Sequence, residues 1–191
     1  MMTFTLDFSS VLEIDDECFA KICHQNPHLD FERTARGELV IKPLSSALHG
    51  NREAELIAAL WQWNNQTKLG KAFSSSTGFH LPNHALYSPD TAWIELSKWQ
   101  NLDPKERKKF ARLCPDFVIE LRSESDSLKT LQQKMVEYID NGVKLGWLID
   151  PQTEQVTIYR VDSEPEVLLK PDVLKGEQVL RDFICELDFL W

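Results

Sequence analysis

The pattern of apolar and polar positions changes along the chain between the spacing of a helix and that of a strand. The strongest helical pattern lies in residues 51–70, where apolar side chains recur every three or four positions and Gly70 stands where a helix C-cap is expected. Residues 15–27 and 125–142 also have helical spacing. Residues 103–113 form a shorter, highly charged segment with a helical composition. The sequence therefore predicts four helices.

Between these segments lie short runs of β-branched and aromatic residues. Two such runs within residues 31–43 flank Arg36-Gly37, which predicts a hairpin. The other expected strands lie near Ala72, near Phe79, near Ile94, over 116–121, over 145–150 and over 156–161, with Asp150-Pro151 as the last turn. Residues 179–191 mix both patterns and predict neither.

The alternation of helices and strands indicates an α/β (α+β) fold, with a mixed β-sheet flanked by helices on both faces. Residues 116–121 are expected to form a central strand, because the segment is apolar on both sides except at Glu120. The helix that begins near Ser127 should pack against it. With 191 residues, of which 42% are hydrophobic, we expect one domain over residues 1–191.

Composition limits the classes of function. The chain has no long apolar run, and its start lacks the basic flank and apolar segment of a signal peptide, so we expect a cytoplasmic protein without a membrane partner. The four cysteines have no CxxC or zinc-site spacing, and no phosphate-loop pattern occurs. A net charge of -9 lacks the basic footprint of a strong nucleic-acid binder, so activity on nucleic acid would need a local basic patch or metal ions.

Histidine does not form a recognisable catalytic or metal-binding pattern here. The five histidines make no HxH or HExxH motif and are interpreted as surface or hydrogen-bonded residues: His24, His28, His49, His80 and His84.

Acidic residues inside apolar runs are the strongest chemical signal. The segments "YSPDTAWIEL" and "CPDFVIELRS" each begin with Pro-Asp, and the second holds Glu120 and Arg122 within its run. Burying a carboxylate is costly unless it is paired or binds a cation. If Asp90 starts one strand and Glu120 ends an antiparallel partner, the two carboxylates meet, whereas Asp116 lies roughly 13 Å from Glu120 at about 3.3 Å per residue. Such a pair suits a hard divalent ion. The same pattern also fits a structural salt bridge between Glu120 and Arg122.

The order of several segments carries a resemblance to a known family. "GELVIKP", "HGNREAELIAALW", "TGFHLPN", "SPDTAWI", "CPDFVIELRSESDSLKTLQQKMVEYIDNG" and "LGWLIDP" resemble the Uma-two family of restriction-endonuclease-like proteins, from about Phe19 onward. That family is a branch of the PD-(D/E)xK nuclease superfamily. The resemblance implies a restriction-endonuclease-like core and an endonuclease that hydrolyses DNA with Mg²⁺ or Mn²⁺. It makes Asp90 the acid of "PD", Glu120 the acid of "(D/E)xK", and the backbone carbonyl of Leu121 a further metal ligand.

The resemblance also assigns the remaining candidates. Arg122 stands where the superfamily has lysine, and relatives that lack this lysine take it from the following helix, which implies Lys134. Glu55 matches the acid of the first core helix, while His80 and Glu124 depart from the arginine and proline common at their positions.

The two cations have different chemistry. A guanidinium stays protonated in proteins, so Arg122 can clamp phosphate but cannot act as a base. Lys134 can act electrostatically, or as a proton shuttle if burial lowers its pKa. The plainer alternative for Lys134 is an exposed helix lysine that pairs with an acid one turn away.

Two classes of function follow. The first is a metal-dependent endonuclease with DNA as its substrate, and the chain is then a candidate homodimer. The second is a non-catalytic nuclease-fold interaction or regulatory protein with a vestigial cation site, which the charge of -9 and Arg122 favour.

Overall fold

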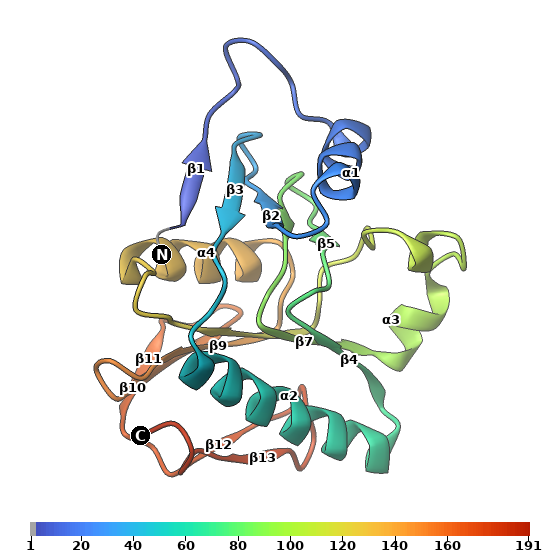
Figure 1. Cartoon of the computed structure of the whole chain (residues 1–191). Helices are drawn as coiled ribbons and strands as arrows, with labels where there is room; N and C mark the ends of the chain where they lie inside the picture. Colours follow the sequence, from blue (N-terminus) through green and yellow to red (C-terminus); the bar gives the residue numbers. More distant parts are fainter. Residues whose placement is uncertain (1–2) are drawn as a thin grey trace.

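A six-stranded mixed sheet forms the centre of the computed structural model, which describes residues 3–191 (Figure 1). Its strands run in the order β11-β10-β9-β8-β7-β4, and only β8 and β9 are parallel neighbours. They are β4 (Gly70–Ser74), β7 (Thr91–Glu95), β8 (Phe117–Leu121), β9 (Leu145–Asp150), β10 (Gln155–Arg160) and β11 (Glu166–Leu169). The expected mixed sheet is therefore present, with β8 in its interior.

Two helices cover opposite faces of this sheet: α2 (Ala47–Thr67) and α4 (Leu128–Asp140) (Figure 1). Side chains of β8 alternate between them, as the pleat of a strand requires. Ile119 packs in the same core cluster as Leu56 of α2, whereas Val118 packs with Met135 of α4. Because β8 is buried on both faces, any charge that it carries needs a partner inside the protein.

A second, smaller sheet lies beyond α4, with strand order β1-β3-β2-β6-β5 (Figure 1). It consists of β1 (Phe4–Leu6), β2 (Asp30–Arg33), β3 (Leu39–Lys42), β5 (Phe79–His80) and β6 (Leu86–Tyr87), and α1 (Asp16–Gln25) packs beside it. The chain leaves this sheet after β6 and enters the main sheet at β7. Asp90 lies at that crossing.

Three short elements complete the fold on the other side of the main sheet and at its edge. The hairpin of β12 (Val173–Lys175) and β13 (Ile184–Glu186) lies against α2, and α3 (Leu96–Asn101) follows β7 (Figure 1). Within residues 3–191, no helix has both the length and the apolar character that a bilayer crossing requires.

Most predicted elements are confirmed, including the hairpin around Gly37, whose φ of +82° suits glycine. Two predictions are wrong. Residues 103–113 contain one 3-10 turn, Glu106–Lys108, instead of an α-helix. Pro104 has no N–H to donate, and the Arg107 side chain donates to the carbonyls of Gln100 and Leu102.

The cap of α2 is also different from the prediction. Lys68 ends the helix with a left-handed φ of 58°, and Gly70 already belongs to β4. A Cβ on Gly70 would lie 2.2 Å from the carbonyl oxygen of Ile94, so this glycine is required by close packing between backbones rather than by a helix end.

Candidate functional site

Asp90 and Glu120 meet at one end of the main sheet. The antiparallel register pairs Thr91 with Ile119, which sets Asp90 opposite Glu120 at the next position. The backbone N–H of Leu121 donates to Asp90 Oδ2 at 2.7 Å. Only 8% of Asp90 and 3% of Glu120 is exposed. Two carboxylates are thus buried side by side, which is costly unless a cation lies near them.

Asp116 lies at the opposite end of β8 and is used differently. The backbone N–H of Glu95 donates to its carboxylate at 2.9 Å, and the ammonium groups of Lys98 and Lys144 lie 3.3 and 3.1 Å from it. Asp116 is therefore a paired acid that joins β7, β8 and the segment before β9.

Lys134 supplies the cation beside Glu120. Its Nζ lies 2.8 Å from Glu120 Oε1 and 2.9 Å from Oε1 of Glu32, a buried acid on β2. The hydroxyl of Tyr138, one turn further along α4, donates to Glu120 at 3.0 Å. With a side chain only 10% exposed, Lys134 does not fit the alternative of an exposed helix lysine.

Arg122 points elsewhere. Its guanidinium donates to Asp150 Oδ2 at 2.8 Å and to the carbonyl of Asp126 at 3.3 Å. The structure thus pairs Arg122 with Asp150 on the neighbouring strand, and the alternative of a Glu120–Arg122 salt bridge is not what it shows. Of the two predicted cations, Lys134 is the one in contact with Glu120.

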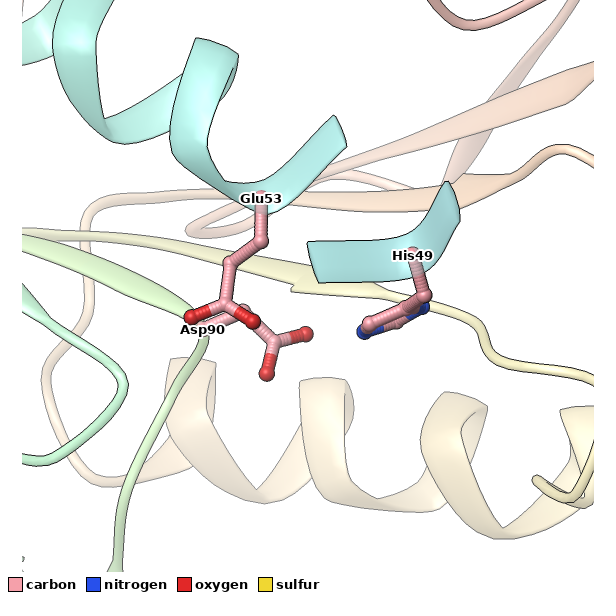
Figure 2. A group of neighbouring side chains, drawn as sticks. All are labelled: His49, Glu53 and Asp90. Atoms are coloured by element: carbon pink, nitrogen blue, oxygen red, sulfur yellow. The ribbon is translucent and has the colours of Figure 1, made fainter. Parts of the chain in front are cut away.

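On α2, the structure brings Glu53 rather than Glu55 to Asp90 (Figure 2). Glu55 is exposed, because residues two apart on a helix point about 200° apart. His49 lies one turn before Glu53 on the same face, and its ring also points toward Asp90. One ligand atom from each of His49, Glu53 and Asp90 lies within 4.8 Å of the others.

Sequence reasoning missed His49 for a local reason. The predicted helix began at Asn51, whereas α2 begins at Ala47, and the Ser46 side chain caps it by accepting from the His49 N–H. Gly50 in the first turns weakened the helical pattern. The signal that could have located this turn is Ser46, a favourable N-cap residue three positions before His49.

His80 and Glu124, the two residues that depart from the family pattern, lie in different parts of the structure. His80 is 2.7 Å from Asp16 and takes part in a separate cluster with Arg33. Glu124 lines a cavity of about 360 Å³ that also reaches Asp90, Glu120 and Lys134. Glu124 therefore lies on the wall of one cavity that reaches the buried acids.

Burial and neighbouring charges shift the protonation of this site. Burial raises the pKa of Glu120 to about 7, and Asp90 acts in the same direction while Lys134 opposes it. Burial alone would lower the pKa of Lys134, but Glu120 and Glu32 outweigh it and raise the pKa. Lys134 is therefore a permanent cation at neutral pH. The condition for a proton shuttle, a pKa lowered by burial, is not met.

The ligand atoms in this cavity suit a divalent cation. Carboxylate oxygens are the ligands that Mg²⁺, Ca²⁺ and Mn²⁺ prefer, and an imidazole adds a nitrogen ligand that transition ions accept. Among residues 3–191, only the Leu121 N–H donates to Asp90, so one oxygen of this buried carboxylate has no protein partner. The residues present thus fit a bound ion.

The fold and the buried acid cluster define the class, a nuclease-like α+β protein. A crystal structure described as a "putative nuclease belonging to DUF820", from Anabaena variabilis, has this fold: the TM-score is 0.71 and the identity 21%, over 84% of this chain and 88% of that chain. The pattern of the Uma2 (Uma-two) family, described as "Putative restriction endonuclease", matches residues 16–188. The chain belongs to this family. Among curated proteins, no sequence matches it.

Proposed function

We propose that this chain is a divalent-metal-dependent endonuclease that hydrolyses phosphodiester bonds in DNA, with Asp90 and Glu120 as ligands of Mg²⁺ or Mn²⁺. The observation that carries the proposal is the register of β7 on β8. It sets the two acids opposite each other, with the Lys134 ammonium 2.8 Å from Glu120. Membership of a family described as a putative restriction endonuclease supports the same reaction class.

Each residue has a distinct part in this proposal. A divalent ion held by Asp90, Glu120 and the carbonyl of Leu121 would supply an activated water and neutralise charge on the phosphate. Lys134 stays protonated and stabilises the negative charge that builds on the phosphate oxygens in the transition state. Glu32 keeps the Lys134 ammonium in place when Glu120 turns toward a cation, because it contacts the same Nζ atom.

The acidic balance of the chain bears on how DNA would approach. A net charge of -9 repels a phosphate backbone, and long-range attraction cannot supply the affinity. Cations bound at the acidic site reduce this repulsion at the point of contact. The homodimer and the cytoplasmic location remain predictions.

One observation favours the non-catalytic alternative. Lys134 bridges Glu32 and Glu120 and already compensates two buried carboxylates without any ion. A nuclease-fold protein that has lost activity could keep such a network for stability alone.

Cleavage of supercoiled plasmid and of branched DNA, with Mg²⁺ or Mn²⁺, separates the two functions. The wild-type protein should nick DNA, and Glu120→Ala should not. Glu55→Gln is the matched control on the exposed face of α2 and should cleave like the wild type. If neither substrate is cleaved above background by the wild-type protein, the non-catalytic alternative is the correct one.

A further inference from the structure

His49, Glu53 and Asp90 converge from two elements on one small volume (Figure 2). The first two lie one turn apart on α2, and Asp90 comes from the crossing into β7. Their three ligand atoms lie within 4.8 Å of one another. Ligands bound to one ion at about 2.0–2.2 Å lie roughly 3–4 Å apart, so a small side-chain shift closes this group around an ion.

Within residues 3–191, these three side chains have few other polar contacts. Among residues 3–191, the His49 ring and the Glu53 carboxylate make no hydrogen bond or salt bridge, and His49 contributes only its backbone N–H to the Ser46 cap. Asp90 is more than nine-tenths buried, yet only Oδ2 has a donor. Among the described residues the other Asp90 oxygen has no donor, and it is not one of the fully buried unpartnered atoms, so it is open to a ligand beside Glu53 and His49.

The neighbouring cations do not neutralise this group. Lys42 Nζ donates to the carbonyl of Ser88 at 3.1 Å and lies 3.4 Å from Glu32, and Lys134 bridges Glu32 and Glu120. Both ammonium groups thus contact other acids, and among the described residues neither forms a salt bridge with Glu53 or Asp90. An ion between Glu53 and Asp90 would remove the repulsion that remains.

The imidazole decides which ion fits. Mg²⁺ takes oxygen ligands and keeps several waters, whereas nitrogen ligands favour first-row transition ions, whose affinity rises from Mn²⁺ toward Cu²⁺. The set of Asp90, Glu120 and the Leu121 carbonyl offers only oxygen and does not make this distinction.

We infer that His49, Glu53 and Asp90 form a cation position that prefers Mn²⁺ and other first-row transition ions to Mg²⁺, with His49 as the residue that sets the preference. The inference rests on the proposed function, because it names the ion of the same centre. Two cavities reach this position, one of about 360 Å³ lined by His49 and Asp90 and one of about 190 Å³ lined by Glu53 and Asp90. An ion thus has a route from solvent.

Isothermal titration calorimetry of the full chain with MnCl₂, CoCl₂ and MgCl₂, in the absence of DNA, tests the inference. The wild-type protein should bind Mn²⁺ and Co²⁺ more tightly than Mg²⁺. His49→Ala should weaken Mn²⁺ and Co²⁺ binding by at least about tenfold, the low end of what losing even an indirect ligand partner costs, and should leave Mg²⁺ binding nearly unchanged. Glu53→Gln should weaken all three ions.

Two controls lie outside the position. His24→Ala removes an exposed imidazole on α1, and Glu55→Gln removes an exposed carboxylate on α2; neither should alter binding of any ion. Equal affinities for Mn²⁺ and Mg²⁺ in the wild type, or unchanged Mn²⁺ binding in a folded His49→Ala, would overturn the inference. Circular dichroism of each variant establishes that it is folded.

Failure of the inference differs from failure of the proposed function. If the wild-type protein cleaves plasmid with Mg²⁺ and His49→Ala cleaves equally well with both ions, the nuclease function holds and the His49 position is wrong. If Mn²⁺ binds through His49 but no DNA is cleaved, the cation position is correct and the nuclease proposal is not.

Discussion

At the scale of single residues, the site depends on an alternating row of buried charges, in which Glu32 and Glu120 flank Lys134 at 2.9 and 2.8 Å. The Lys134 ammonium and the two carboxylates stabilise one another, because each charge would be costly to bury alone. In Glu120 the charged form is the less stable one, because burial and the neighbouring Asp90 both raise its pKa. A bound cation would therefore stabilise the Glu120 carboxylate.

The first prediction concerns the pH dependence of stability without metal. The pKa of Glu120 is about 7 in the folded state and 4.5 ordinarily. Between these two pH values, Glu120 is protonated in the folded protein and ionised in the unfolded chain. Its contribution therefore lowers the free energy of unfolding as pH rises from about 4.5 to 7. In EDTA, the melting temperature of the wild type relative to Glu120→Gln should fall across this window. A difference that rises with pH would show that Glu120 is stabilised as a carboxylate.

The second prediction separates the two cations. Lys134→Met leaves buried Glu120 without its cation and Glu32 with Lys42 alone, which should destabilise the fold by about 3–5 kcal/mol and remove cleavage. Arg122→Met leaves buried Asp150 without its cation and should also destabilise the fold, but cleavage by the folded fraction should persist. Chemical denaturation and plasmid nicking measure the two effects. If Lys134→Met does not fold, Lys134→Arg, which keeps the charge, replaces it in the cleavage assay. Loss of cleavage in Arg122→Met but not in the Lys134 variant would mean that Arg122, and not Lys134, is the catalytic cation.

Single-residue prediction from sequence had a clear physical limit. Asp90 and Glu120 could be paired because strand alternation and register relate neighbouring strands by simple rules. Glu32 gave no signal, because its partner Lys134 is 102 positions away and belongs to a helix that packs between two sheets. Contacts of this kind are set by tertiary packing rather than by any local period.

At the scale of elements, helix α2 shows where periodicity is informative and where it is not. Its apolar face was predicted from spacing, but both of its ends were misplaced. The prediction began at Asn51 and had Gly70 as the C-cap, whereas the N-cap is Ser46 and the C-cap is Lys68. Helix ends depend on capping geometry, which a pattern of apolar positions does not encode. The missed first turn is the one that carries His49.

The third prediction compares two glycines at the ends of α2. A Cβ on Gly50 would meet nothing within 4 Å, so Gly50→Ala should stabilise the helix by about 0.5–1 kcal/mol. A Cβ on Gly70 would lie 2.2 Å from the Ile94 carbonyl oxygen, so Gly70→Ala should destabilise the fold by about 1–3 kcal/mol. Urea denaturation of both variants measures the difference. Equal effects would mean that Gly70 is not constrained by β7.

At the scale of the whole molecule, the two sheets and the helix between them bring distant segments to one place. Asp90 lies where the chain crosses from the small sheet to the main one. Helix α2, which carries Glu53, covers one face of the main sheet, and α4, which carries Lys134, covers the other (Figure 1). The mixed sheet with helices on both faces could be predicted from the alternation of element types. The hairpin of β2 and β3 and the strand near Phe79 were also predicted, but their union in a separate second sheet could not be, because pairing between distant segments leaves no local period. The other two strands of that sheet, β1 and β6, have three and two residues and are too short to show a period.

The central claim is that Asp90 and Glu120 form a metal-dependent hydrolytic centre, and the most direct test is the cleavage rate of a supercoiled plasmid against ion concentration for wild type and Asp90→Asn. The wild-type rate should be zero in EDTA and should rise to saturation with Mn²⁺ or Mg²⁺. Asp90→Asn, folded by circular dichroism, should stay at least about 100-fold slower at every concentration, as expected for loss of a principal charge-stabilising group. Cleavage by the wild type in EDTA, or an Asp90→Asn rate equal to that of the wild type, would contradict the account.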